Sequence, residues 1–230
     1  MKLLAIDTAT EACSAALWLD GEIVSRHELA PRRHTELILP MVDAVLQSAS
    51  LQLETLDALA FGRGPGSFTG VRIAAACIQG LAWAARLPVV PVSTLAAIAQ
   101  ATIEMQQAEA VACAMDARMG EVYWGCYIRD AAGFATLHGK EMVVPPDAIP
   151  VPGARTWHAA GTGWDIYRET LLAHCGMEPV AFNDHCLPDA RYIATLAAEA
   201  YRLGLAVRPE EALPVYLRNK VTHQRSPSNK

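Results

Sequence analysis

Short apolar runs separated by polar turns occupy the first thirty positions of the chain. Apolar runs lie at 2–6 and 13–19, and a polar turn at Asp20-Gly21 leads into a third run at 22–29. Runs of this length, bounded by turn residues, are typical of strands. The pattern therefore predicts three strands that follow one another as a meander.

Beyond position 30 the apolar positions take up the period of a helix and then alternate between helix and strand. Thr35 and Glu36 provide a start signal for the first helix. The predicted elements are a helix at 35–50, a strand at 56–61, a helix at 69–87, a strand at 89–92 and a helix at 93–107.

The second half of the chain repeats this succession with little sequence identity. Its predicted elements are strands at 109–116, 121–128 and 134–144, a vestigial helix at 145–149, a strand at 155–160, a helix at 164–174, a strand at 179–182 and a helix at 189–203. A duplicated βββαβαβα order predicts an α/β protein of two lobes, 1–107 and 108–230. Each lobe has a mixed β-sheet with crossover helices, and a cleft lies between them.

A glycine-rich segment, FGRGPGSFTGVR at 61–72, connects a predicted strand to the Ala-rich helix. A glycine turn before a helix N-terminus can hold an anion, and it can equally let the helix pack closely on its strand. No Lys-Ser or Lys-Thr pair follows the glycines, so the segment is not a P-loop. Both interpretations remain open at this point.

The turns predicted to face the cleft carry carboxylates, hydroxyls and glycines. Asp7 and Thr10 lie in the first such turn, 116–120 forms its counterpart, and a second glycine turn contains Gly161 and Gly163. Such groups can hold a metal-phosphate, or they can simply cap turns. One hypothesis is therefore an ATP-dependent phosphotransferase of small substrates that uses Asp7, Thr10, Gly161 and Gly163.

The two helices of the first lobe carry more apolar surface than a helix on a sheet usually needs. The helix at 35–50 has two neighbouring apolar rows, and the strongly polar residues of 69–87 are confined to Arg72, Gln79 and Arg86 on one stripe. Either the helix at 69–87 is buried in its own domain, or the two helices form a contact surface for another subunit.

Composition restricts the function classes further. The formal net charge of −5 provides no field that attracts nucleic acid to this chain alone. Asp7 interrupts what would be the apolar part of an export signal, and the best membrane candidate, 71–87, contains three polar residues. The six cysteines show no CxxC spacing, which favours buried thiols in the reducing cytoplasm.

The usual catalytic patterns are missing from the sequence. His34 would need a partner histidine at 38 to form a metal pair, and Ile38 stands there; the HExxH and GxSxG patterns are absent as well. We therefore predict no catalytic residue, no metal site and no cofactor. The polar tail from Lys220 onward is mildly basic, which is compatible with a solvated end or with an RNA or partner contact.

Several stretches together resemble one protein family. These are IDTATEACSAAL at 6–17, HTELILPMVDAVL at 34–46, FGRGPGSFTGVRIA at 61–74, VPVSTLAAIA at 90–99, DARMGEVYWG at 116–125 and PVYLRN at 214–219. They are similar to the bacterial TsaB (YeaZ) family over nearly the whole chain. The resemblance implies the ASKHA fold, the two-lobe architecture of actin and Hsp70.

The resemblance also implies a pathway and partners. Members of this family act in making threonylcarbamoyladenosine, the modified base 3' to the anticodon of tRNAs that read codons starting with A. They pair with the paralogue TsaD, which transfers the threonylcarbamoyl group from an intermediate supplied by TsaC; TsaE joins the complex. TsaD uses two histidines one helical turn apart for its metal. In this chain His34 is the candidate counterpart of one of them, and Ile38 stands at the other position. The resemblance therefore implies a non-catalytic scaffold.

The resemblance implies a contact surface too. The family binds TsaD through its first two helices and, when alone, self-associates through the same surface. Carried over by position, the implied contact residues are Leu37, Met41, Ala44, Val71, Ala74, Cys77, Ile78 and Leu81.

Overall fold

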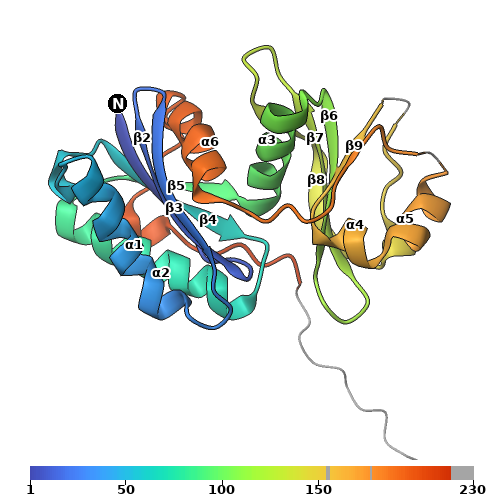
Figure 1. The fold of residues 1–230 in the computed structure, drawn as a ribbon, viewed down its shortest axis with the longest axis horizontal. Helices are drawn as coiled ribbons and strands as arrows, with labels where there is room; N and C mark the ends of the chain where they lie inside the picture. The colour runs from blue at the N-terminus through green and yellow to red at the C-terminus, as the bar shows by residue number, and fades with distance from the viewer. Residues whose placement is uncertain (154–155, 177, 219–230) are drawn as a thin grey trace, which may run out of the picture.

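Two lobes lie side by side in the structure, a computed structural model that describes residues 1–153, 156–176 and 178–218 (Figure 1). Each lobe is built on a five-stranded mixed sheet. The tail from position 220, and with it the possible RNA or partner contact, lies outside the described residues, as does the first residue of the strand predicted at 155–160.

The first sheet has the strand order β3-β2-β1-β4-β5. Its strands are β1 (Lys2–Asp7), β2 (Ala12–Leu19), β3 (Glu22–Leu29), β4 (Ala58–Gly64) and β5 (Val89–Ser93). The first three strands form the predicted antiparallel meander, and β4 runs parallel to β1 with Phe61 beside Ile6. This register places Asp7 and the glycines after Phe61 at the same edge of the sheet.

The second sheet repeats the topology of the first with the order β8-β7-β6-β9-β10. Its strands are β6 (Ala110–Asp116), β7 (Val122–Arg129), β8 (Ala135–Val144), β9 (His158–Ala160) and β10 (Phe182–Asn183). Again a meander of three antiparallel strands is extended by a parallel strand beside the first one. The predicted duplicated ASKHA-type architecture is confirmed.

Helices α1 (His34–Ser48) and α2 (Phe68–Ala85) cover the outer face of the first sheet, with the 3-10 turn η1 (Leu53–Thr55) between α1 and β4. The Ser67 side chain caps α2 by accepting a hydrogen bond from the Gly70 N–H. By length and composition α2 could cross a membrane. Its inward side is buried in the apolar core of the first lobe, as expected of a helix in a globular domain.

The second lobe covers its outer face with much shorter helices. These are the 3-10 turn η2 (Pro146–Ala148), α4 (Thr162–Ile166) and α5 (Arg168–Cys175). The single helix predicted at 164–174 is divided at Tyr167, whose backbone lies outside the helical region. Trp124 and Trp164, with ring centres 6.1 Å apart, fill much of the core beneath these helices.

Helices α3 (Thr94–Gln106) and α6 (Ala190–Arg202) lie between the two sheets (Figure 1). α6 packs on the first sheet although it comes from the second half of the chain, and α3 places Leu95 and Ile98 against β6 and β7. The five strands of the first sheet thus precede those of the second in the chain, whereas the helices on the inner faces come from both halves of it. The short turn η3 (Pro209–Glu211) follows α6 and packs on α2.

Candidate functional site

The turn after β1 carries Asp7, which the sequence placed in a nucleotide cleft. Its side chain is fully buried. One carboxylate oxygen accepts a hydrogen bond from the Ala9 N–H (3.1 Å), and the other has no partner among the described residues. Because burial removes water from the carboxylate, the pKa of Asp7 is raised from 3.8 to about 7. Asp7 therefore offers no accessible charge to a metal-phosphate in this conformation.

The glycines of the 61–72 segment pack directly on that turn. A Cβ at Gly62 would lie 1.8 Å from an Asp7 carboxylate oxygen, and one at Gly70 would lie 2.0 Å from the Thr8 carbonyl oxygen. A Cβ at Gly66 would lie 2.5 Å from the Ala9 carbonyl oxygen. Side chains at these positions would collide with the turn, so the glycines are required for close packing. This favours close packing over an anion site as the role of the segment.

Hydrogen bonds hold the glycine segment against the turn. The Ser67 N–H donates to the Ala9 carbonyl oxygen (2.7 Å), and the Thr8 hydroxyl donates to the Gly70 carbonyl oxygen (2.7 Å). The start of α2 is thus occupied by protein groups on the side that faces β1.

A cleft of about 1060 Å³ separates the lobes beyond this packed turn. Thr10 lines it, whereas Asp7 lies beneath its wall. Gly161 and Gly163 pack on Ala114 of β6, where an added Cβ would lie 2.6 and 2.8 Å from its backbone. Of the four residues predicted to form a nucleotide cleft, Thr10 lines this space, and Asp7, Gly161 and Gly163 are packed in its walls.

The second-lobe turn after β6 carries Asp116, the topological counterpart of Asp7. Asp116 lines the cleft and forms an ion pair with Arg118 (3.1 Å). Its backbone N–H donates to the hydroxyl of Thr162, another cleft residue (3.2 Å). Thr162 is not among the site residues predicted from the sequence, although its place between two glycines of a turn was a usable signal.

Arg72, Arg118 and Arg218 on the cleft wall are engaged by the protein itself, and Arg32 also lines the cleft. Arg118 also reaches Glu11 (3.4 Å) from the first lobe, and Arg218 pairs with Glu121. The Arg72 guanidinium stacks on the Phe68 ring, 3.4 Å from its centre. These contacts reduce the positive charge that the cleft presents to a polyphosphate.

The contact residues implied for α1 and α2 fall into two groups. Met41, Ala74 and Ile78 are buried in the core of the first lobe, so they support the helices from beneath and present no surface to a partner. Val71 is buried as well, at the wall of the interlobe cleft. The other four, which are partly exposed, lie beside two exposed small residues of α2. We call these six the α1–α2 face: Leu37, Ala44, Ala76, Cys77, Gly80 and Leu81.

Comparison with known proteins identifies the family. A family model described as TsaD, tRNA N6-adenosine threonylcarbamoyltransferase, matches residues 23–223. The tRNA threonylcarbamoyladenosine biosynthesis protein TsaB of Escherichia coli is 44% identical over 99% of both chains. TsaB of Haemophilus influenzae is 42% identical over 99% of this chain and 98% of its own. The chain belongs to the TsaB family.

A solved TsaB-family structure supports the same assignment. YeaZ from Pseudomonas aeruginosa is 49% identical and superimposes with a TM-score of 0.89, over 94% of this chain and 99% of its own. The chain is thus a TsaB-family protein of tRNA threonylcarbamoyladenosine biosynthesis with an ASKHA-like fold.

His34 begins α1, at the position where the TsaB resemblance implied a vestige of a metal pair. The side chain is largely buried, and its Nε2 atom has no hydrogen-bond partner among the described residues. Ile38, one turn later, is buried in the apolar core of the first lobe. An apolar core residue at this position cannot supply a second metal ligand.

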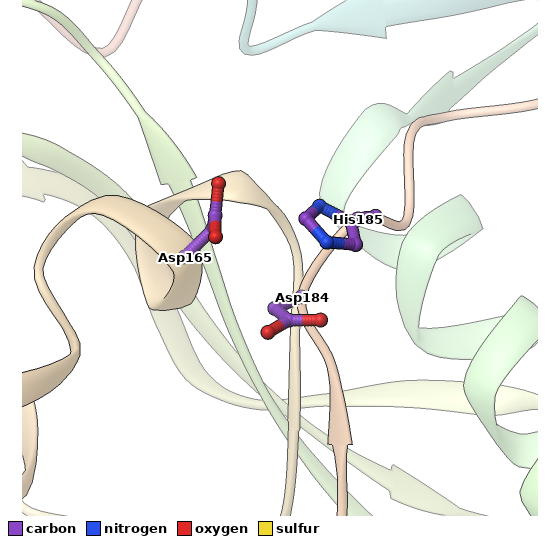
Figure 2. Close-up of side chains that lie close together, drawn as sticks. All are labelled: Asp165, Asp184 and His185. Carbon is purple, nitrogen blue, oxygen red and sulfur yellow. The ribbon is translucent and has the colours of Figure 1, made fainter.

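A group of ionisable side chains elsewhere in this TsaB-family chain has the separation of metal ligands. Asp165, Asp184 and His185 place one ligand atom each within 4.8 Å of one another (Figure 2). They come from α4 and from the segment after β10, so no sequence spacing indicates them. Arg168 forms an ion pair with Asp184, which lowers the attraction of this cluster for a cation.

Proposed function

We propose that this chain is a non-catalytic scaffold that holds TsaD in its active arrangement during threonylcarbamoylation of the adenosine 3' to the anticodon, in tRNAs reading codons that start with A. The names of its relatives support the pathway. The match to a transferase family model supports descent from an enzyme fold.

The packed turn after β1 carries the non-catalytic part of this proposal. A metal-phosphate held by the turn after β1 would need free space beside Asp7. In this chain Gly62 and Gly70 bring that turn into contact with Asp7 and Thr8. A buried carboxyl group with a pKa of about 7 is poorly suited to bind a hydrated metal-phosphate.

The α1–α2 face supports the scaffold part. Ala76 and Gly80 are exposed on α2, and a Cβ at Gly80 would meet nothing within 4 Å. Small side chains at the surface of a long helix allow another helix to approach closely. We propose that this face binds TsaD in the complex and a second copy of the chain when the protein is alone.

The remaining partners follow from this assignment. TsaE joins the complex and TsaC supplies the threonylcarbamoyl intermediate, while tRNA is held through the complex because a chain of net charge −5 provides little attraction of its own. We further propose that the protein acts in the cytoplasm, without a resident cofactor or metal.

The test is tRNA threonylcarbamoylation reconstituted from purified components. We expect modified tRNA when TsaD and this chain are both present, and none when this chain replaces TsaD. Transfer by this chain in the absence of TsaD would overturn the proposal. A reaction whose rate does not depend on this chain would remove the scaffold role.

One observation favours the rival function, an ATP-dependent phosphotransferase. An open cleft remains between the lobes beyond the packed turn, and Thr10, Asp116 and Thr162 line it. Titration calorimetry with ATP and Mg²⁺ distinguishes the two functions. Heat of binding that is lost in a Thr162→Val variant would support the nucleotide role, whereas the scaffold proposal expects no such signal.

A further inference from the structure

The segment Ala212–Arg218, which follows η3, runs from the first lobe to the second. On the first lobe the Ala212 carbonyl oxygen accepts a hydrogen bond from the Gln79 side chain of α2 (3.2 Å). The Val215 N–H donates to the Arg63 carbonyl oxygen at the end of β4 (2.8 Å). This half of the segment is thus fixed to both a helix and a strand of the first lobe.

An aromatic and cationic cluster strengthens that attachment. The Tyr216 ring lies 5.9 Å from the Phe68 ring, measured between centres, and its hydroxyl accepts a hydrogen bond from Arg72 (2.9 Å). The Arg72 guanidinium covers the Phe68 ring as well. Aromatic pairs and stacked arginines of this kind provide stabilisation beyond simple burial.

The last described residue, Arg218, reaches the second lobe. Its guanidinium pairs with Glu121, next to β7, and also donates to the Arg118 carbonyl oxygen (3.4 Å). The side chains of Arg218 and Glu121 are only 20% and 31% exposed. Because such a pair is partly shielded from water, it is stronger than a fully exposed one.

Arg63 connects the segment to a second contact between the lobes. Its guanidinium lies 3.5 Å from Glu141 of β8, whose carboxylate also binds Ser93 and Tyr127. Ser93 precedes the helix α3 that leads from the first sheet to the second. The backbone of Arg63 thus holds the segment while its side chain holds the second lobe.

We propose that Ala212–Arg218 is a strap that fixes the opening between the lobes. Val215, Tyr216 and Arg218 line the interlobe cleft, so a strap held at both ends also limits access to it. Breaking the Arg218 end releases the second lobe and leaves the strap held at one end only, so its first-lobe contacts open more often. The Arg63 to Glu141 contact then remains as a connection between the lobes.

The test uses charge reversal of the strap's second-lobe anchor in the protein alone. Glu121→Arg and Arg218→Glu each place like charges together, and the double variant restores an opposite-charge pair. We expect hydrogen exchange of the 212–218 peptide, which contains the Val215 amide, to be about ten-fold faster in each single variant and to return toward the wild-type rate in the double variant. Small-angle scattering should report a larger radius of gyration for the single variants alone.

A matched control is Arg202→Glu, which breaks the ion pair with Glu199 on α6 and should leave strap exchange unchanged. If a charge-reversal variant fails to fold, Glu121→Gln and Arg218→Gln serve as single variants with smaller perturbation, and each should still raise strap exchange. Unchanged strap exchange in the single variants, or fast exchange that persists in the double variant, would overturn the proposal.

Discussion

Asp7 and Asp116 stand at the same place in the two lobes, at the end of the first strand of each sheet, yet their surroundings are opposite. Asp7 is sealed beneath Gly62, and one of its oxygens has no partner among the described residues. Asp116 lines the cleft and is paired with Arg118. The repeated topology thus places an aspartate at the equivalent position of each lobe, while the neighbouring side chains decide what each aspartate can do.

The outer helices differ between the lobes in the same way. The first lobe keeps α1 and α2, of 15 and 18 residues, whereas the second has a 3-10 turn and helices of 5 and 8 residues. The long α2 exposes small residues, and Trp83 near its end is 62% exposed. The second lobe instead buries Trp124 and Trp164 beneath short helices. Among the described residues, a long helical surface on the outer side of a sheet is found in the first lobe alone.

The largest expected effect concerns the sealed carboxyl group. Between pH 4 and pH 7 the folded chain keeps a proton on Asp7 that the unfolded chain has released, so this residue lowers the free energy of unfolding as pH rises through that window. In Asp7→Asn this loss should disappear. Urea denaturation should show the variant gaining up to about 4 kcal/mol relative to wild type between pH 4 and pH 8. A difference that does not change with pH would contradict the burial of an ionisable Asp7.

Gly70→Ala tests the packing that seals the first-lobe turn. The added methyl would meet the backbone oxygen of Thr8, which cannot rotate away, so we expect a loss of about 3 kcal/mol in the free energy of unfolding. Gly80→Ala on the same helix is the control. Its methyl would enter open space and should stabilise α2 by about 0.5–1 kcal/mol. Equal effects of the two substitutions would remove the close-packing explanation.

Ala76→Arg tests whether α2 is the partner surface. Because Ala76 is exposed, an arginine there should leave the lone protein folded and weaken binding to TsaD by at least about ten-fold in titration calorimetry. Ala173→Arg places the same side chain on the exposed side of α5 and should leave binding unchanged. Ala74→Arg would be a misleading test, because Ala74 is fully buried and a charge there would unfold the lobe. Wild-type affinity of Ala76→Arg would exclude this part of α2 from the contact.

The smallest effect is expected at the open turn of the second lobe. Arg118 is 74% exposed where it pairs with Asp116 and Glu11, so Arg118→Ala should cost less than about 1 kcal/mol in urea denaturation. A loss of unfolding free energy comparable to that of Gly70→Ala would contradict the difference between the packed turn of the first lobe and the open turn of the second.

The burial pattern explains why the sequence could not tell which apolar row of α1 and α2 faces the core and which faces outward. The apolar rows of α1 and α2 were visible as helical periodicity, but both rows look alike in a sequence. The structure directs Ala74 and Ile78 inward, because β4 and α1 complete a core around them, and it buries Val71 at the wall of the cleft. The cleft residues were harder still, because Thr162 and Asp116 come together only through the pairing of β6 with β9.

The sequence by itself determined the elements, their duplicated order and the family, because these depend on local periodicity, turn chemistry and motifs that are continuous in the chain. Only the tertiary structure decided that α6 covers the first sheet, that the glycines hold a turn rather than leaving an open anion site, and that a strap joins the lobes. Each of these depends on contacts between residues far apart in the chain, whose distances and burial a linear pattern does not encode.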